Sequence, residues 1–437
     1  MYDLSTLPPP GERTVSDLTN RIDDDAPRTA PATAQAPSRP GRALPRRVLL
    51  TVSGTISPTL AADIEARKRP RADYLEIARR LGADLLDYAG ARALTGRVGS
   101  ALEKLGGPNL VLAYACWRMR SRYRAILTDG EQVGLPLAAL FKLIRRGRPQ
   151  HVMITHVISP PKKTRVIDAL RLVSGIDRFV VYCSRQREFV LHRWRLQPER
   201  VPCIPFMVDA DFFDPVTVTP QPGPRPRICS VGLERRDYPT LLAAVDGLEV
   251  DLVVAAASPW SKQTDGMSSV RIPSNVTIRR FTQYELRQLY ADCDLMVMPL
   301  QDVDFQAGVT AILEAMAMGK PVVCSRTSGQ TDVIVDGVNG CYVPVGNASA
   351  LRAQIIHLLE RPQERARLGA GAREAVVQRF TLDRYTERLF TILQDVGCGC
   401  GEEGATTSAG GHDERSASDV ASPRAADLKS WRQTSDG

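Results

Sequence analysis

Short apolar segments typical of strands alternate with helical segments along most of this chain, and that alternation restricts the possible folds most strongly. The first series has helices over 71–82 and 134–146 and strands at 46–54, 83–89, 123–129, 150–156, 177–184 and 201–208. The second series has helices at 237–248 and 282–293 and strands at 228–232, 250–258, 275–281, 294–300 and 322–324. Strands that alternate with helices predict parallel sheets covered by helices on both faces. We therefore expect an α/β protein with two Rossmann-like halves.

Composition shifts divide the chain into segments. Residues 1–45 and 398–437 are rich in small and polar residues, which predicts a disordered arm and a disordered tail. A proline-dense stretch at 214–227 separates the two series and predicts a linker over 214–223. The expected domains are therefore 46–213 and 224–378, followed by a last helix over 379–397.

Charge and hydropathy narrow the class of protein. The 437 residues carry a formal net charge of +8, but no nucleic-acid-binding motif accompanies it, so we expect no nucleic-acid partner. No apolar run approaches the roughly 20 residues of a membrane-spanning helix, and the N-terminus lacks the pattern of a secretory signal. The expected location is the cytoplasm or the inner face of the membrane.

Residues 305–325 combine an apolar stripe with polar side chains at a helix start. Val309, Ile312, Leu313, Met316 and Ala317 recur at helical spacing, and Gly319 and Pro321 predict the end of the helix. The free amides of its first turn form a site for an anion such as a diphosphate. Glu314 is expected on a side away from the stripe, where it can accept hydrogen bonds from a diol. A solvated Glu314 and an ordinary loop residue at Gln306 remain the alternative.

The stretch "LEAMAMGKPVV" followed by "SGQTDVIVDGVNGCYV" resembles the donor-binding half of the retaining glycosyltransferases of family 4. This resemblance implies the GT-B fold, in which two Rossmann-like domains face each other across a cleft and the last helix crosses back to the first domain. It also implies that Glu314 holds the nucleotide ribose. Gln306 occupies the place of a glutamate that contacts the donor sugar, so we expect it at the catalytic centre. The family's donor-binding loop amides would be those of Ala307, Gly308, Val309 and Thr310.

Two arginines follow the strand that ends at Gly232. Arginine at a strand end can clamp a diphosphate. In the resemblance, Arg236 takes the place of a phosphate-binding lysine, while Leu233 stands where the family has an arginine, a role that Arg235 would have to fill. Lys262 is a further candidate phosphate ligand. A pair of surface charges is the alternative for the two arginines.

Polar residues also follow the strands of the first half. The resemblance places His156 beside the transferred sugar, in a catalytic position. Gly54, Asp129 and Glu131 lie at expected strand ends and would shape an acceptor pocket. Tight turns and helix caps explain the last three residues equally well.

The run Arg67, Lys68, Arg69 and Arg71 is the strongest basic cluster of the first half. It would contact anionic lipid headgroups or an acceptor phosphate, although a solvated charge run is the simpler explanation. Cys398 and Cys400 lack the spacing of a four-ligand zinc site. No aspartate pair suits a nucleotide-bound Mg²⁺, so we expect no essential metal and no cofactor.

Together these features predict transfer of a hexosyl group from a nucleotide sugar to a sugar or lipid-linked acceptor, with retention of configuration. Gln306 and Leu233 keep a second interpretation open, a non-catalytic protein that binds sugar nucleotides or serves as a scaffold. A nucleotide-sugar epimerase on the same fold is a third. The sequence does not identify the base, the sugar or the acceptor.

Overall fold

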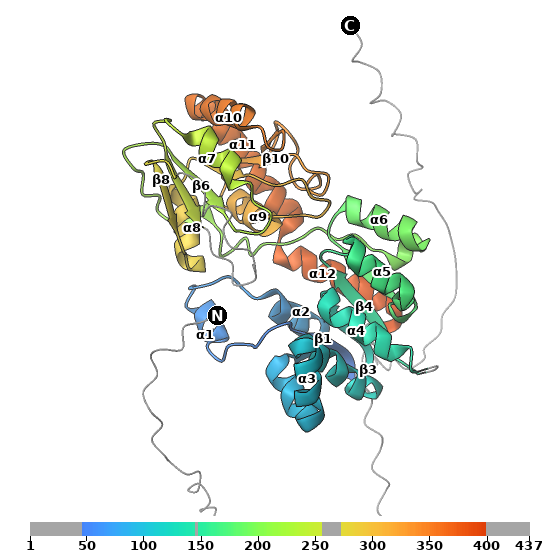
Figure 1. The fold of residues 1–437 in the computed structure, drawn as a ribbon. Coiled ribbons are helices and arrows are strands. Elements are labelled where there is room, and N and C mark those ends of the chain that lie inside the picture. The colour runs from blue at the N-terminus through green and yellow to red at the C-terminus, as the bar shows by residue number, and fades with distance from the viewer. Residues whose placement is uncertain (1–45, 145–146, 256–271, 399–437) are drawn as a thin grey trace, which may run out of the picture. The chain divides into compact units, whose positions relative to one another are not determined.

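A computed structural model describes residues 46–144, 147–255 and 272–398 of the chain. It contains two parallel sheets, each with helices on both faces (Figure 1). The predicted α/β class with two Rossmann-like halves is confirmed. Lys262, Cys400 and the predicted arm and tail lie outside the described residues, as does the side chain of Cys398.

The first sheet has five strands in the order β2-β1-β3-β4-β5. They are β1 Arg46–Thr51, β2 Asp84–Leu86, β3 Tyr123–Asp129, β4 Gln150–Thr155 and β5 Arg178–Val181. In β1, Val48 and Leu50 pack on one face of the sheet and Leu49 packs on the other. Burial on both faces explains why these strands are continuously apolar.

Helices precede, connect and cover the strands of this sheet. They are α1 Leu60–Glu65, α2 Asp73–Leu81, α3 Tyr88–Met119, α4 Glu131–Phe141, α5 Pro161–Ala169, α6 Ser184–Trp194 and α12 Leu382–Leu393. Leu81 of α2 and Leu389 of α12 share a core with Val48, so α12 packs on the first sheet although it follows the second sheet in the sequence (Figure 1).

The second sheet has six strands in the order β11-β10-β9-β6-β7-β8. They are β6 Arg227–Val231, β7 Asp251–Ala255, β8 Val276–Arg279, β9 Leu295–Met298, β10 Val322–Ser325 and β11 Cys341–Val343. The helices are α7 Tyr238–Val245, α8 Gln283–Asp292, α9 Val309–Ala317, α10 Ala348–Glu360 and α11 Pro362–Ala375. Helices α7 and α10 cover one face, and α8 and α9 cover the other.

The strand predicted at 201–208 is wrong. This segment makes only isolated bridges, from Cys203 to Val181 and from Val208 to Thr381. Pro202 and Pro205 explain the difference, because proline has no backbone N–H to donate to a strand ladder.

Within the described part of the chain, no helix combines the length and apolar character needed to cross a bilayer.

Candidate donor and acceptor sites

Helix α9 begins at a glycine with a left-handed backbone, and its first two amides make no hydrogen bond to another described residue. Gly308 has φ +77° and caps the helix, and the first helical hydrogen bond runs from the amide of Ile312 to the carbonyl of Gly308 (3.0 Å). The preceding amides of Val309 and Thr310 therefore have no acceptor in the helix. The amide of Ala307 instead donates to the carbonyl of Phe305 at 2.7 Å, so the protein itself engages this amide, and its role in binding a donor stays a prediction.

Arg236 lies directly against this helix start. A Cβ atom added to Gly308 would lie 3.1 Å from Nη2 of Arg236, and one added to Gly232 would lie 2.5 Å from it. Within the described part of the chain, the guanidinium donates to two main-chain oxygens, those of Val231 (2.9 Å) and Glu234 (2.7 Å). Among the described residues it has no acidic partner, and its burial lowers its pKa. A half-buried cation beside a free helix N-terminus forms a binding site for an anion.

The neighbouring arginine is placed differently. Arg235 is exposed and has a left-handed backbone with φ +58°. Its carbonyl accepts a hydrogen bond from the amide of Gln301 at 2.9 Å, which holds the loop after β6 against the loop after β9. Of the predicted pair, Arg236 is the one whose guanidinium lies close to Gly308, while Arg235 is exposed.

Glu314 is buried, which corrects the prediction that it lies away from the apolar stripe. It is 5% exposed, because every residue of α9 except Thr310 is buried. The hydroxyl of Tyr290 in α8 donates to Oε2 of Glu314 at 2.9 Å. Burial raises the pKa of Glu314 to about 7, although the bond from Tyr290 acts in the opposite direction. Oε1 has no hydrogen-bond partner among the described residues.

Gln306 lies just before α9 with one polar atom enclosed. Its side-chain oxygen is buried and has no hydrogen-bond partner in the described part of the chain. The side-chain amide of Gln330 supports the same loop by donating to the carbonyl of Ala307 at 3.0 Å. An enclosed acceptor without a donor is costly unless a ligand supplies one.

His156 and Asp129 form a pair at the carboxyl end of the first sheet. Nε2 of His156 lies 3.4 Å from Oδ1 of Asp129, and its ring lies against Tyr182 with 5.5 Å between ring centroids. Burial lowers the pKa of His156, but Asp129, Glu131 and Asp73 together outweigh it, so that the pKa is raised.

Glu131 is a structural residue, contrary to the prediction that it lines an acceptor pocket. It is 3% exposed, and Oε1 accepts a hydrogen bond from the amide of Val157 at 2.6 Å. Lys163 lies 3.9 Å from Oε2. The carboxylate therefore fixes the loop that follows His156.

Gly54 is likewise engaged by the protein. Its amide donates to the carbonyl of Val52 (2.8 Å), and its carbonyl accepts from the amide of Tyr88 (2.9 Å).

Two residues that sequence reasoning missed belong to these sites. Tyr290 holds Glu314, and Asp73 at the start of α2 has its pKa raised to about 6 by burial and by Asp129. The position of Asp73, an acid at a predicted helix start after a basic run, is a signal that could have identified it. No spacing rule connects Tyr290 to Glu314, because the two lie on different helices.

The basic run is not a continuous free surface. Nη2 of Arg71 lies 3.0 Å from carboxylate oxygens of both Asp209 and Asp211, and its Nη1 lies 3.2 Å from Asp383. Arg71 therefore joins the segment after α6 to α12. Arg67 and Lys68 remain exposed.

No metal site was predicted. Within the described ranges, no group of three or more His, Cys, Asp or Glu side chains could hold a metal ion. The prediction that no metal is essential stays a prediction.

Comparison with known proteins agrees with this organisation. Residues 231–361 match the family model described as glycosyl transferases group 1. D-inositol 3-phosphate glycosyltransferase from Saccharomonospora viridis is 26% identical over 269 residues, which cover 54% of this chain and 60% of that protein. The alignments with the first curated relatives span between 13% and 60% of their lengths.

Solved structures share the fold at low identity. Sucrose-phosphate synthase from Thermosynechococcus elongatus has a TM-score of 0.61 at 17% identity, covering 80% of this chain and 99% of that one. Anabaena Alr3699/HepE in complex with UDP-glucose has a TM-score of 0.60 at 17% identity, with the same coverage. Residues 231–361 thus resemble the glycosyl transferases group 1 family, within a chain that has the GT-B fold.

Proposed function

We propose that this protein transfers a hexosyl group from a nucleotide sugar to an acceptor hydroxyl, with retention of the anomeric configuration. The acceptor would be a sugar or a lipid-linked molecule. The donor would bind to the second domain, between the loop after β6 and the start of α9. The family match and the solved relative bound to UDP-glucose support a nucleotide-sugar donor.

The position of Arg236 carries the proposal. Its guanidinium lies against Gly232 and Gly308 without an acidic partner among the described residues, next to the unbonded amides of Val309 and Thr310. A diphosphate would supply the missing negative charge. The same groups would stabilise that diphosphate as it leaves, because they are already oriented towards the developing charge.

Glu314 would bind the nucleotide ribose. Tyr290 occupies Oε2, which leaves Oε1 to accept hydrogen bonds from a ribose hydroxyl. Gln306 would meet the donor sugar, since a sugar hydroxyl would donate to its enclosed side-chain oxygen.

Retention would follow from attack of the acceptor on the face that the diphosphate leaves. The acceptor oxygen forms the new glycosidic bond while the bond from the anomeric carbon to the phosphate oxygen breaks. The acceptor proton passes to that phosphate oxygen, so no protein nucleophile is needed. His156, held by Asp129, would donate a hydrogen bond to a hydroxyl of the transferred sugar.

Two neighbouring arginines provide a matched test. A thermal-shift panel of UDP-, GDP- and ADP-sugars first identifies the donor, because tight ligands stabilise the folded state. Arg236→Ala should weaken binding of the matching nucleoside diphosphate by roughly tenfold or more, as loss of charge-assisted hydrogen bonds predicts. Arg235→Ala removes the same charge one residue away and should leave affinity near the wild-type value. Equal effects of the two substitutions would refute the assignment of Arg236.

Incubation of the donor with candidate sugar acceptors then measures transfer, and NMR of the product gives the configuration of the new linkage. An inverted linkage would refute retention. Gln306 favours one other function, a protein that binds sugar nucleotides without turnover. Tight donor binding with neither transfer nor donor hydrolysis would support that alternative.

A further inference from the structure

Three aliphatic side chains are exposed together at α5 and at the end of α4. Leu143, Val166 and Leu170 are 74%, 50% and 51% exposed. Thr164 and Ile167 on the inner side of α5 are buried, so the apolar residues on its outer side do not contribute to the core.

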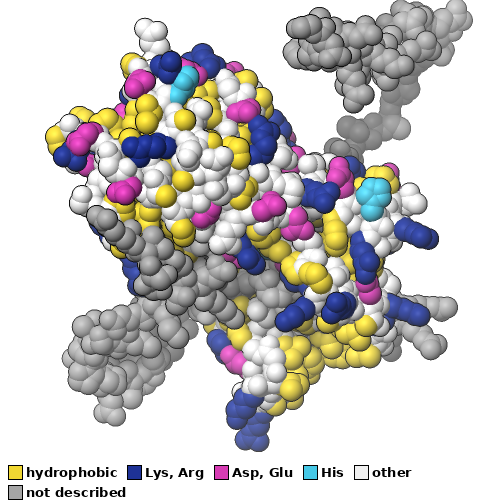
Figure 2. All heavy atoms as spheres, turned by 45° about the horizontal axis from the view of Figure 1, so that its top comes forward, with side chains coloured by type: hydrophobic (Ala, Val, Ile, Leu, Met, Phe, Trp, Pro, Cys, Tyr) yellow, Lys and Arg dark blue, Asp and Glu magenta, His cyan; other side chains and the backbone are white. Residues whose placement is uncertain are grey.

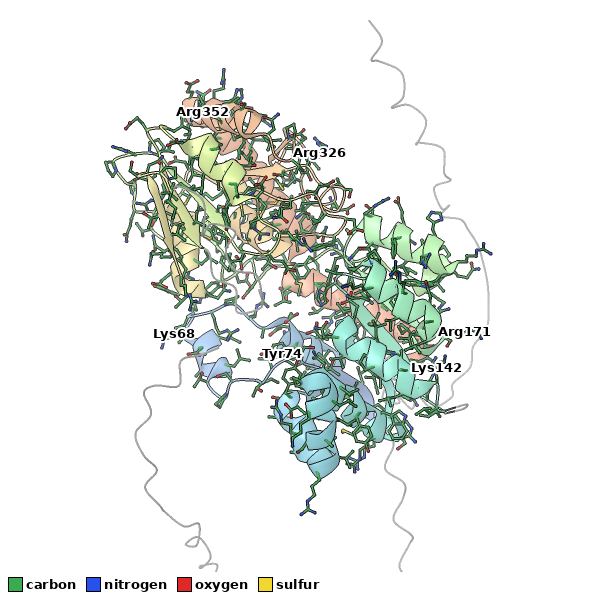
Figure 3. All side chains as sticks on the ribbon, in the orientation of Figure 1. Lys68, Tyr74, Lys142, Arg171, Arg326 and Arg352 are labelled. Atoms are coloured by element: carbon green, nitrogen blue, oxygen red, sulfur yellow. The ribbon has the colours of Figure 1, made fainter. Side chains whose placement is uncertain are left out.

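Four exposed cations surround these aliphatic side chains. They are Lys142, Lys162, Arg165 and Arg171. None of them has an acidic partner among the described residues. Lys142 donates through Nζ to the carbonyl of Leu170 at 2.5 Å, which joins the end of α4 to the end of α5. Figure 3 shows Lys142 and Arg171 on neighbouring elements, and Figure 2 shows cationic and apolar side chains interspersed over the face in view.

The one acidic residue of α5 is already neutralised. Asp168 accepts hydrogen bonds from Arg193 and, at 2.7 Å, from Nε1 of Trp194. Lys162 and Arg165 of α5 are therefore not neutralised by the acidic residue of their own helix.

We propose that this surface, formed by Lys142, Leu143, Lys162, Arg165, Val166, Leu170 and Arg171 and named here the α5 surface, binds an anionic lipid bilayer. Side chains of Leu143, Val166 and Leu170 would enter the boundary between headgroups and acyl chains. The cations would contact lipid phosphates, and a surface that combines both kinds of side chain binds membranes more strongly than either alone. A soluble anion would engage the cations but leave the three apolar side chains in water.

The α5 surface differs from the basic run at residues 67–71. Arg71 is bound by Asp209, Asp211 and Asp383. Lys68 lies well apart from Lys142 and Arg171 in Figure 3, so substitutions can test the two surfaces separately. The proposal does not depend on the proposed transferase activity, because vesicle binding is measured without donor or acceptor.

Co-sedimentation of the full chain with vesicles tests the proposal. Binding is expected to vesicles of phosphatidylcholine with phosphatidylglycerol, and much less to phosphatidylcholine alone. Lys162→Glu with Arg165→Glu should lower the vesicle partition coefficient by roughly tenfold or more, since each basic residue near an anionic surface contributes measurably to binding. Val166→Ser with Leu170→Ser should also lower it while the charge is unchanged.

The matched control is Arg67→Glu with Lys68→Glu, which makes the same change of charge elsewhere on the first domain. This control should bind vesicles nearly as strongly as the wild type, apart from a small loss caused by its lower net charge. The proposal would be overturned if the charge variant and the apolar variant of the α5 surface both bound vesicles as strongly as the wild type. It would also be overturned if the control lost more vesicle binding than the charge variant. Thermal unfolding of each variant shows that it is folded, as these exposed positions predict.

Discussion

Tyr290 donates a hydrogen bond of 2.9 Å to Glu314 across two helices that cover the same face of the second sheet. The bond fixes one carboxylate oxygen in a buried setting, where an unpaired charge would be unfavourable. Helix α9 therefore carries a buried ionisable side chain where it packs against α8. Ionisation of Glu314 should therefore affect both the stability of the second domain and the site proposed for the ribose.

Substitution of Glu314 by Gln should remove a pH dependence of stability. Burial raises the folded-state pKa of Glu314 from its ordinary 4.5 to about 7. The folded protein therefore keeps a proton that the unfolded chain loses, and stability falls as pH rises from about 4.5 to about 7. Gln cannot ionise and can still accept from Tyr290. Urea unfolding should show that Glu314→Gln is more stable than the wild type by up to about 3 kcal/mol at pH 8, and that the difference nearly vanishes at about pH 4. Parallel pH profiles for the two proteins would contradict a raised pKa.

Substitution of Gly308 by Ala should weaken both stability and nucleotide binding. Its φ of +77° disfavours other residues, and the added Cβ would lie 2.7 Å from Sδ of Met298 and 3.1 Å from Arg236. Gly247 is the control, since it has φ +70° but nothing within 4 Å of an added Cβ. Gly247→Ala should cost about 1 kcal/mol from backbone strain alone. Gly308→Ala should cost more in chemical unfolding and, unlike the control, should lower affinity for the nucleoside diphosphate. Equal losses would mean that contact with Arg236 has no consequence.

Replacement of Asp129 by Asn should lower the pKa of His156. The carboxylate of Asp129 contributes to raising that pKa and also to raising that of Asp73. Removing its charge should move both pKa values downward. NMR titration of the His156 ring measures the effect directly, with the exposed His192 of α6 as an internal control. An unchanged His156 titration would show that the 3.4 Å pair has no electrostatic effect.

Exchange of Gln306 for Glu should change donor preference or transfer rate. Glu places a charge where the structure encloses an acceptor oxygen without a partner among the described residues. The ratio of kcat/KM values for two donor sugars with a common nucleotide measures this effect. Gln306→Asn serves as the uncharged comparison and should lower activity, because the shorter side chain withdraws the amide from the sugar. If Gln306→Glu changes neither preference nor rate, the side chain does not meet the sugar.

Residues that begin or end helices explain why much of the second domain could be predicted from sequence. Gly319 takes the left-handed backbone expected after α9, and Pro321 precedes β10 as predicted. Asp237 caps α7 by accepting from the amide of Thr240 at 3.3 Å. These signals act between residues a few positions apart, so periodicity and turn chemistry suffice to find them.

The failures come from contacts between residues distant in sequence or from broken helical patterns. Arg71 looked like a solvated charge because its partner Asp209 lies 138 residues away. Helix α3 was not predicted, because Gly96 and Gly107 interrupt it with non-helical backbone and Pro108 follows. The burial of Glu314 depends on α8, whose packing no local pattern reveals.

The position of α12 also affects how the chain can be made. Tyr385, Leu389 and Leu393 supply part of the core under β1, although about 330 residues separate them from that strand. During synthesis the first sheet emerges from the ribosome long before the helix that covers it. An apolar face of the first sheet therefore stays partly exposed until the second half has been synthesised. A chain that ends just before residue 381 would leave that face without α12.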